Sequence, residues 1–189
     1  YAALYMGMID WAELTEKEDK DSSYYEWLMK IGRRNAWQVG KYMYHADHIA
    51  VGQVFLDMYQ KYHDRNMWLP TLARTEFVIN HPSASTLELD YRNMASLERW
   101  SWCDALFMAP PVYAKMYMLT DDWKYIEFMN REYKATYDYL FDKEEKITSV
   151  YCDEYSEDYE YGYDAPPAID MELLKAISQQ CRELGWLDE

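Results

Sequence analysis

Apolar residues recur at three- and four-residue intervals through most of the first 140 positions, the spacing that places them on one face of an α-helix. The pattern predicts six helices up to residue 140 and a seventh over 169–184. The inward faces predicted for the first, second, third and sixth helices are Leu4, Tyr5, Met8, Trp11 and Ala12; Tyr24, Trp27, Leu28 and Ile31; Val51, Val54, Phe55, Met58 and Tyr62; and Ile126, Met129, Tyr133, Tyr137 and Leu140.

Polar residues and prolines predict where several of these helices begin and end. Ser23 and Glu26 fit a capping box at the start of the second helix. Pro70 suits the first turn of the fourth helix, and residues 80–99 then form a polar connecting loop. Within the fifth segment, residues 110–111 are both proline, so that helix is kinked there or begins there.

Tyrosines alternate with acidic residues over about 147–165, which is compatible with a β-hairpin or with an irregular loop. We favour the loop, because the like charges repel one another. Helices joined by short connections normally pack antiparallel to their neighbours. The sequence therefore predicts a single all-α domain over 1–189, built as an array of α-hairpins or as an α/α toroid.

The charge balance excludes several classes of partner. The chain carries 34 acidic and 19 basic residues, a net charge of −15, which would repel nucleic acid and anionic membrane surfaces. No apolar stretch is long enough to span a bilayer. The spacing of Cys103, Cys152 and Cys181 supports neither a disulfide framework nor a zinc site. The sequence starts at Tyr1 without a methionine, so either a leader has been removed or the sequence begins inside the fold.

The first cluster of candidate functional residues lies at the start of the third helix. Asp47 is flanked by His45 and His48 and is followed by the apolar stripe of that helix. A carboxylate in the first turn of a helix is favoured by the helix dipole, so a purely structural role accounts for Asp47 on spacing alone. A metal site is the weaker alternative, because three ligands on one short segment rarely converge without a distant partner.

The second cluster surrounds Asp104, whose neighbours in sequence include Trp102, Leu106, Phe107 and Met108. An apolar surrounding removes water from a charged carboxylate, so the pKa rises and the group can hold a proton near neutral pH, as a general acid must. The structural alternative is that Asp104 caps a helix and that the aromatic residues belong to the core. The neighbouring Cys103 is interpreted as a small buried hydrophobe, because no base accompanies it.

The segment from Trp102 to Pro111 resembles the signature of glycoside hydrolase family 105, the unsaturated rhamnogalacturonyl hydrolases, which are related to the unsaturated glucuronyl hydrolases of family 88. Separate motifs follow in the family's order and spacing at residues 3–8, 11–13, 44–47, 51–53 and 137–145. The resemblance covers about residues 1–146 and leaves 147–189 as a divergent tail.

The resemblance implies an (α/α)6 toroid whose inner helix ends surround a pocket. It also implies a substrate from polysaccharide degradation, for example of pectin: an oligosaccharide with a 4,5-unsaturated uronic acid at its non-reducing end. Such enzymes hydrate the double bond, and the hemiketal that results collapses and releases the uronic acid. By position Asp104 is the acid and base, Asp47 is the second active-site aspartate, and Trp102 and Met108 lie beside the acid. The resemblance implies neither a metal nor an organic cofactor.

A net charge of −15 does not attract a uronate from a distance. Local donors must therefore bind the substrate carboxylate, and Arg99 or Arg33 are the candidates that the sequence offers. His45 and His48 are expected to contact the substrate beside Asp47. His48 stands where many relatives carry an aspartate.

Family members are about twice as long as this chain, which supplies about seven of the twelve helices of a toroid, and their later Arg-Gly-Asn-Gly-Trp stretch has no equivalent here. Three interpretations stay open. The chain is a truncated relative, or it becomes complete when another copy or chain supplies the remaining wall, or it is a non-catalytic carbohydrate-binding or interaction module. An open half-toroid exposes apolar faces and so predicts self-association. Relatives occur in the bacterial cytoplasm and periplasm, and the sequence does not choose between them.

Overall fold

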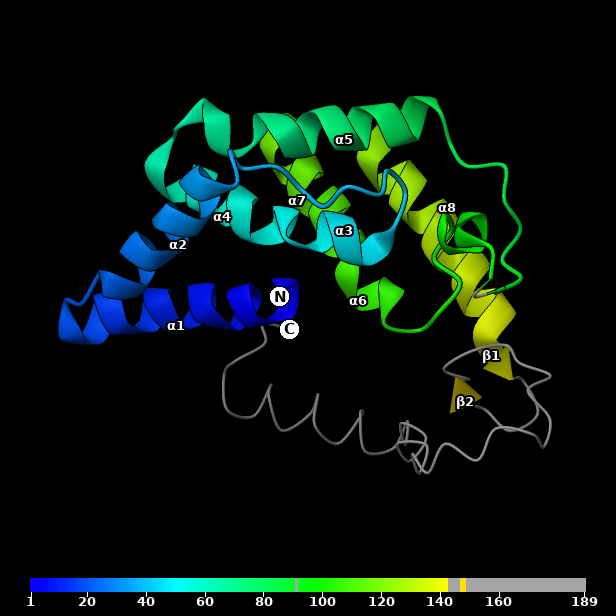
Figure 1. Ribbon diagram of the computed structural model, residues 1–189, viewed down its shortest axis with the longest axis horizontal. Coiled ribbons are helices and arrows are strands. Elements are labelled where there is room, and N and C mark those ends of the chain that lie inside the picture. Colours follow the sequence, from blue (N-terminus) through cyan, green and yellow to red (C-terminus); the bar gives the residue numbers. More distant parts are fainter. Residues whose placement is uncertain (91, 143–146, 149–189) are drawn as a thin grey trace.

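The computed structural model describes residues 1–90, 92–142 and 147–148, and it confirms the predicted all-α fold (Figure 1). Its α-helices are α1 (Ala2–Asp19), α2 (Ser23–Arg34), α3 (Ala46–Ala50), α4 (Gly52–Tyr62), α5 (Leu69–Asn80), α6 (Ala105–Met108), α7 (Pro110–Thr120) and α8 (Lys124–Leu140). Two short 3-10 helices are η1 (Arg65–Met67) and η2 (Met94–Leu97). Strands β1 (Phe141–Asp142) and β2 (Ile147–Thr148) pair antiparallel after α8.

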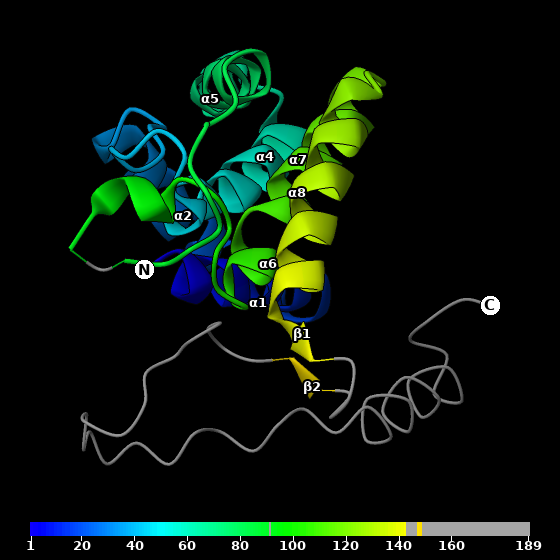
Figure 2. The same cartoon turned by 90° about the vertical axis from the view of Figure 1, so that its right-hand side faces the viewer.

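The helices form an inner row and an outer layer. Helix α4 packs against α1 on one side and α7 on the other, so these three helices make the inner row. Each of them also packs against the helix that follows it: α1 against α2, α4 against α5, and α7 against α8. Figure 2 shows α2, α5 and α8 around the outside of α4 and α7. Alternation of inner and outer helices is the arrangement predicted for a partial α/α toroid.

Helix α4 is the centre of the packing. Its residues 52–56 and Met58 are all buried. Val54, Phe55 and Met58 belong to an apolar cluster with α1 and α2, whereas Leu56 belongs to a second cluster with α7 and α8. A Cβ atom at Gly52 would lie 2.9 Å from Cγ2 of Thr71, so only glycine lets α4 approach α5 this closely.

Several predicted helix boundaries are corrected by the structure. The third predicted helix is divided into α3 and α4, with a turn at Val51 between them. The prolines at 110–111 open α7 and do not kink a longer helix. The predicted capping box is wrong, because α2 is capped by Ser22 without any side-chain bond. The backbone N–H of Ser23 instead donates to Oδ1 of Asp21 at 2.9 Å.

All four predicted inward faces are wrong in part, since Trp27 of α2 and Tyr62 of α4 are exposed. Leu4 and Trp11 of α1 are exposed, because that helix is apolar on more than one side and periodicity alone does not say which side faces inward. On α8 the buried positions are Tyr125, Phe128, Glu132, Thr136 and Leu140, whereas the predicted Tyr133 and Tyr137 are exposed. The pattern failed there because a charged residue, Glu132, occupies an inward position.

The predicted helix over 169–184, most of the tyrosine-rich segment, and two of the three cysteines lie outside the described residues. The predicted connecting loop at 80–99 is present and contains η2. Within the described part of the chain, no helix is long and apolar enough to cross a membrane.

Candidate active site

Asp47 lies in the first turn of α3, as the sequence predicts. The helix is capped by His45, whose Nδ1 accepts a hydrogen bond from the backbone N–H of Asp47 at 3.2 Å. This bond satisfies a backbone donor at the helix start and leaves the Asp47 carboxylate free of the capping role. The Asp47 side chain is exposed to solvent.

Asp104 occupies the N-cap position of α6, but its carboxylate makes no capping hydrogen bond. The carbonyl oxygen of Asp104 accepts instead, from the backbone N–H groups of Phe107 at 2.9 Å and Met108 at 3.1 Å. The structural role considered for this side chain, a helix cap, is therefore absent. Asp104 is more exposed than the sequence predicts, because Trp102 turns into the core and Phe107 into solvent.

Helices α3 and α6 pack against each other and bring these two segments together. Gln53, buried on α4, fixes the arrangement: its Nε2 donates to the carbonyl oxygens of Met108 at 2.9 Å and Phe107 at 3.3 Å. The His45 ring lies 5.0 Å from the ring of Trp102, measured between centroids. The charges of Asp47 and Asp104 act on the pKa of His45, and those of Asp47 and His45 act on the pKa of Asp104.

The surroundings of Asp104 favour its protonated form more than water does. Partial loss of water raises the pKa of its carboxyl above the ordinary 3.8, and the like charge of Asp47 raises the pKa further. A positive charge on His45 acts in the opposite direction. Burial lowers the pKa of His45 below 6.5, so this imidazole is mainly neutral at pH 7 and opposes the shift only weakly. Lost hydration and the charge of Asp47 therefore act together to raise the pKa of Asp104.

Comparison with protein families finds a match over most of the chain. The profile of the family described as Glycosyl Hydrolase Family 88 matches residues 1–160. The chain belongs to glycosyl hydrolase family 88. The resemblance found in the sequence, to family 105 and its relative family 88, is thereby confirmed.

Two curated relatives carry the name unsaturated 3S-rhamnoglycuronyl hydrolase. The protein from Alteromonas sp. (strain LOR) is 29% identical over 153 residues, which cover 76% of this chain and 36% of that protein. The protein from Formosa agariphila is 30% identical over 133 residues, which cover 69% of this chain and 35% of that protein. This family 88 chain thus spans about a third of the length of the curated relatives it matches.

Solved structures share the fold. A family 88 glycosyl hydrolase from Bacteroides vulgatus superposes with a TM-score of 0.61 at 22% identity, covering 80% of this chain and 43% of the other. A polysaccharide lyase superposes with a TM-score of 0.62 at 20% identity, covering 80% and 42%. At these identities the similarity establishes the helical fold alone.

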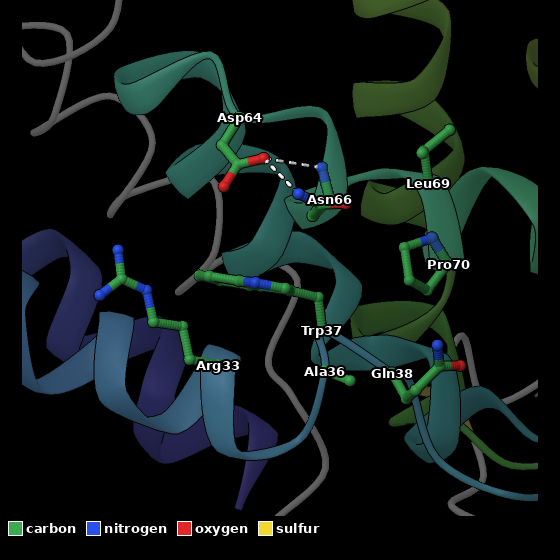
Figure 3. Close-up of a pocket in the computed structure, with 8 residues that line it drawn as sticks. All are labelled: Arg33, Ala36, Trp37, Gln38, Asp64, Asn66, Leu69 and Pro70. Carbon is green, nitrogen blue, oxygen red and sulfur yellow. Dashed lines mark hydrogen bonds between the residues drawn. The ribbon is translucent and has the colours of Figure 1, made fainter.

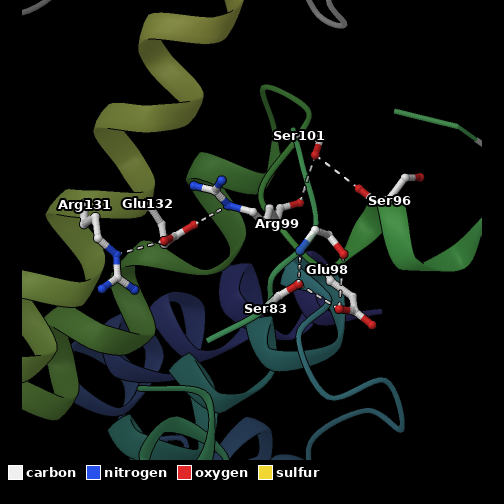
Figure 4. A network of polar contacts seen from close by, with 8 residues as sticks. Ser83, Ser96, Glu98, Arg99, Ser101, Arg131 and Glu132 are labelled. Carbon is white, nitrogen blue, oxygen red and sulfur yellow. Dashed lines mark hydrogen bonds and ion pairs between the residues drawn. The ribbon is translucent and has the colours of Figure 1, made fainter. Parts of the chain in front are cut away.

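Of the other predicted site residues of this family 88 chain, four lie near α3 and α6, and Arg99 does not. Trp102, Met108, His45 and His48 lie on or beside α3 and α6, around the two aspartates. Arg99 is held elsewhere. Its Nε donates to Oε2 of the buried Glu132 at 3.0 Å, and Arg131 donates to the other oxygen of that carboxylate, also at 3.0 Å (Figure 4).

Two cavities flank the loop that joins α2 to α3. One of about 370 Å³ lies beside the aspartate of α3; it is lined by Tyr1, Ala2, Tyr5, Ile31, Asn35, Gln38, Gly40, Asp47, His48, Val51 and Phe55. It contains no Lys or Arg among the described residues that line it. Sequence analysis did not identify Tyr5, Asn35 or Gln38 as site residues, because only the packing of α1 and the path of the loop after α2 bring them to Asp47.

The second cavity, of about 490 Å³, shares Gln38 with the first and is shown in Figure 3. Arg33 lines this second cavity and not the one beside Asp47. Opposite it, Asn66 donates two hydrogen bonds to Oδ1 of Asp64, at 2.9 and 3.0 Å. Both arginines that the sequence offers as uronate donors therefore lie outside the cavity that Asp47 lines; Asp104 is not among its lining residues either.

The structure bears on two alternatives from the sequence, a metal site around Asp47 and a nucleophilic role for Cys103. Among the described residues, no three His, Cys, Asp or Glu side chains are arranged to hold a metal ion, and Nδ1 of both His45 and His48 accepts a backbone N–H. Cys103 is half-buried, and burial together with the nearby Asp104 raises the pKa of its thiol. A raised pKa leaves less thiolate, so Cys103 is poorly suited to act as a nucleophile.

Proposed function

We propose that this chain supplies the acid/base half of a site that hydrates the 4,5 double bond of an unsaturated uronic acid at the non-reducing end of an oligosaccharide. The observation that carries the proposal is the Asp104 carboxyl, whose pKa is raised by lost hydration and by Asp47. Membership of family 88 and the names of the two curated relatives support the same class of substrate.

The reaction assigns one task to each group. The double-bond electron pair takes the proton of Asp104 at C4, and the ring oxygen stabilises the positive charge that develops at C5. Water then adds at C5 and gives its proton to the Asp104 carboxylate, which restores the acid. The hemiketal formed at C5 opens and releases the uronic acid from the linked sugar. Asp47, close by and negative, stabilises the cationic intermediate and keeps the proton on its neighbour before the reaction.

The cavity beside Asp47 suits the neutral parts of such a substrate. The Asn35 and Gln38 side chains line it, and amides donate and accept hydrogen bonds to sugar hydroxyls. The Tyr5 ring lines the same cavity and offers an apolar face. Because Arg33 and Arg99 lie outside this cavity, we propose that the substrate carboxylate is bound by groups other than these two arginines.

The test is consumption of an unsaturated disaccharide, followed as loss of absorbance of the conjugated double bond. We expect Asp104→Asn to abolish the signal while the helical circular dichroism is retained. Asp121→Asn is the matched control, because this exposed residue ends α7, the helix that follows α6, at its far end. Equal rates for wild type and Asp104→Asn would refute the assignment of the acid.

A non-catalytic carbohydrate-binding or interaction module is the second candidate. The observation that favours it is the exposure of both carboxylates, in a chain that spans about a third of its curated relatives. Calorimetric binding of the same disaccharide without consumption would support this module. Turnover by the wild-type chain would exclude it.

A further inference from the structure

The loop between α2 and α3 is held by one side chain from a different helix. Arg74 of α5 donates three hydrogen bonds to carbonyl oxygens of this loop: Nη2 to Gly40 at 2.6 Å, and Nη1 to Tyr42 at 2.8 Å and Met43 at 3.1 Å. Arg74 is half-buried, and a guanidinium stays charged in such a position. A planar fork that reaches three carbonyls fixes the path of the loop.

On its other side the same loop is bonded to His48. The backbone N–H of Tyr42 donates to Nδ1 of His48 at 3.3 Å, and the N–H of Gly40 donates to the His48 carbonyl oxygen at 2.6 Å. The fit is close, since a Cβ atom at Gly40 would lie 2.3 Å from Nδ1 of His48. The loop therefore lies between Arg74 and the imidazole of His48 and touches both.

The hydrogen bonds also determine which ring nitrogen carries the proton. Nδ1 of His48 accepts from Tyr42, and Nδ1 of His45 accepts from Asp47. A neutral imidazole that accepts at Nδ1 must carry its hydrogen at Nε2. Burial lowers the pKa of both histidines, so the neutral form predominates at pH 7. Both rings therefore present an Nε2–H donor.

Successive ring contacts through His48 and His45 connect the loop to the aspartate site. The centroid of His48 lies 4.7 Å from that of Tyr42 and 5.1 Å from that of His45, and the His45 ring lies 5.0 Å from that of Trp102. His45 is also the group whose charge opposes proton retention at Asp104.

We propose that Arg74 is a positioning residue of the aspartate site: by holding residues 40–43 against α3, it fixes His48 as an Nε2–H donor beside His45, the residue that caps the helix carrying Asp47. The effect on turnover rests on the proposed function, but the effect on the His48 ring does not. Arg74 touches neither aspartate, and its contribution is made through the loop.

Long-range ¹H–¹⁵N correlation spectra of the histidine rings test this inference directly, because the chain has only four histidines. In the wild type we expect His45 and His48 to show single Nε2–H tautomers. In Arg74→Gln His48 should change to mixed tautomers, whereas His45, whose Nδ1 accepts from Asp47 within α3, should keep its tautomer. Arg74→Lys should do the same, because one ammonium cannot satisfy three carbonyls in a fork. Arg34→Gln, an exposed arginine that ends α2, should leave the wild-type pattern.

The pKa of His48 separates charge from geometry. The pKa of His48 is affected by burial and by the charges of His45, Asp47, Arg74 and Lys41. The Arg74 charge lowers this pKa. The pKa should rise in Arg74→Gln and rise less in Arg74→Lys, which keeps the charge, whereas the single His48 tautomer should be lost in both. The wild-type His48 tautomer in a folded Arg74→Gln protein would overturn the proposal.

Gly40→Ala provides an independent variant if Arg74→Gln does not fold. It leaves α5 and every charge unchanged but brings a methyl group against Nδ1 of His48. Loss of the His48 tautomer in folded Gly40→Ala supports the proposal, and an unchanged tautomer overturns it. These spectra need no substrate, so a chain that fails to hydrate the disaccharide would count against the proposed function and leave this inference standing.

Discussion

Gln53→Leu should weaken both the fold and the aspartate site, because Gln53 joins α4 to the end of α6. The side chain is 8% exposed and donates to two carbonyl oxygens, at 2.9 and 3.3 Å. A hydrogen bond contributes about 0.5–1.5 kcal/mol net, and a buried acceptor left unpaired costs about 1–3 kcal/mol. The 3.3 Å bond is long and contributes less. Leucine keeps the volume, so we expect a loss of about 1–3 kcal/mol in the free energy of unfolding.

The same substitution should act on Asp104. Without the bonds from Gln53, α6 is free to shift from α3, the like charge of Asp47 then acts from further away, and the pKa of Asp104 should fall towards 3.8. Urea unfolding measures the stability, and a carbon-13 titration of the Asp104 carboxyl measures the pKa. Gln60→Leu, an exposed glutamine on the same helix, should stay within about 0.5 kcal/mol of wild type. If Gln53→Leu is indistinguishable from Gln60→Leu in both measurements, the reasoning is wrong.

Three further predictions concern other parts of the molecule. Asp104→Asn should stabilise the fold near neutral pH, because ionising a carboxyl whose folded pKa is raised opposes folding. The gain in the free energy of unfolding should vanish as the pH falls below 3.8. A difference between wild type and variant that stays constant over a pH series of unfolding curves would contradict this. Lys115→Met should lower the free energy of unfolding by about 1–3 kcal/mol at pH 7 and by less at pH 4. It leaves the partly buried Asp57 carboxylate, whose pKa burial already raises, without its ion pair. Equal losses at both pH values would show that the charge is not responsible. Trp11→Ser, on the exposed apolar face of α1, should reduce concentration-dependent self-association measured by light scattering, and a wild-type chain that is monomeric at all concentrations would remove the basis for this expectation.

The helices could be predicted because local chemistry determines them. Apolar spacing identified each described α-helical segment of the inner row and outer layer, and of the two alternatives at residues 110–111, a kink or a helix start, the structure shows the start of α7. The inward face of α8 could not be read from apolar residues, because Glu132 is buried there with its charge paired to Arg99 and Arg131. Such pairing depends on residues distant in sequence, so no periodicity reveals it.

The candidate site was predictable where it depends on side chains within a motif. Asp104 and Asp47 were named as candidates from their motifs, and α3 and α6 bring them together; their catalytic role stays a prediction. Gln53 and Arg74 were not recognised as supports of the site, because their partners are backbone carbonyls in other segments. Every residue has a carbonyl, so the sequence carries no signal for such a bond. Tyr5, Asn35 and Gln38 were missed because they reach the cavity beside Asp47 only through the packing of segments distant in sequence.

The central position of α4 has a consequence for motion. Local opening exposes segments that have few buried contacts, whereas a helix enclosed by both apolar clusters is released only when the whole domain unfolds. The amide protons of residues 53–58 should therefore exchange with deuterium more slowly than those of any other described segment. Asp47 stands one turn before this helix, so one of the two proposed catalytic carboxylates is attached to the part of the fold that fluctuates least.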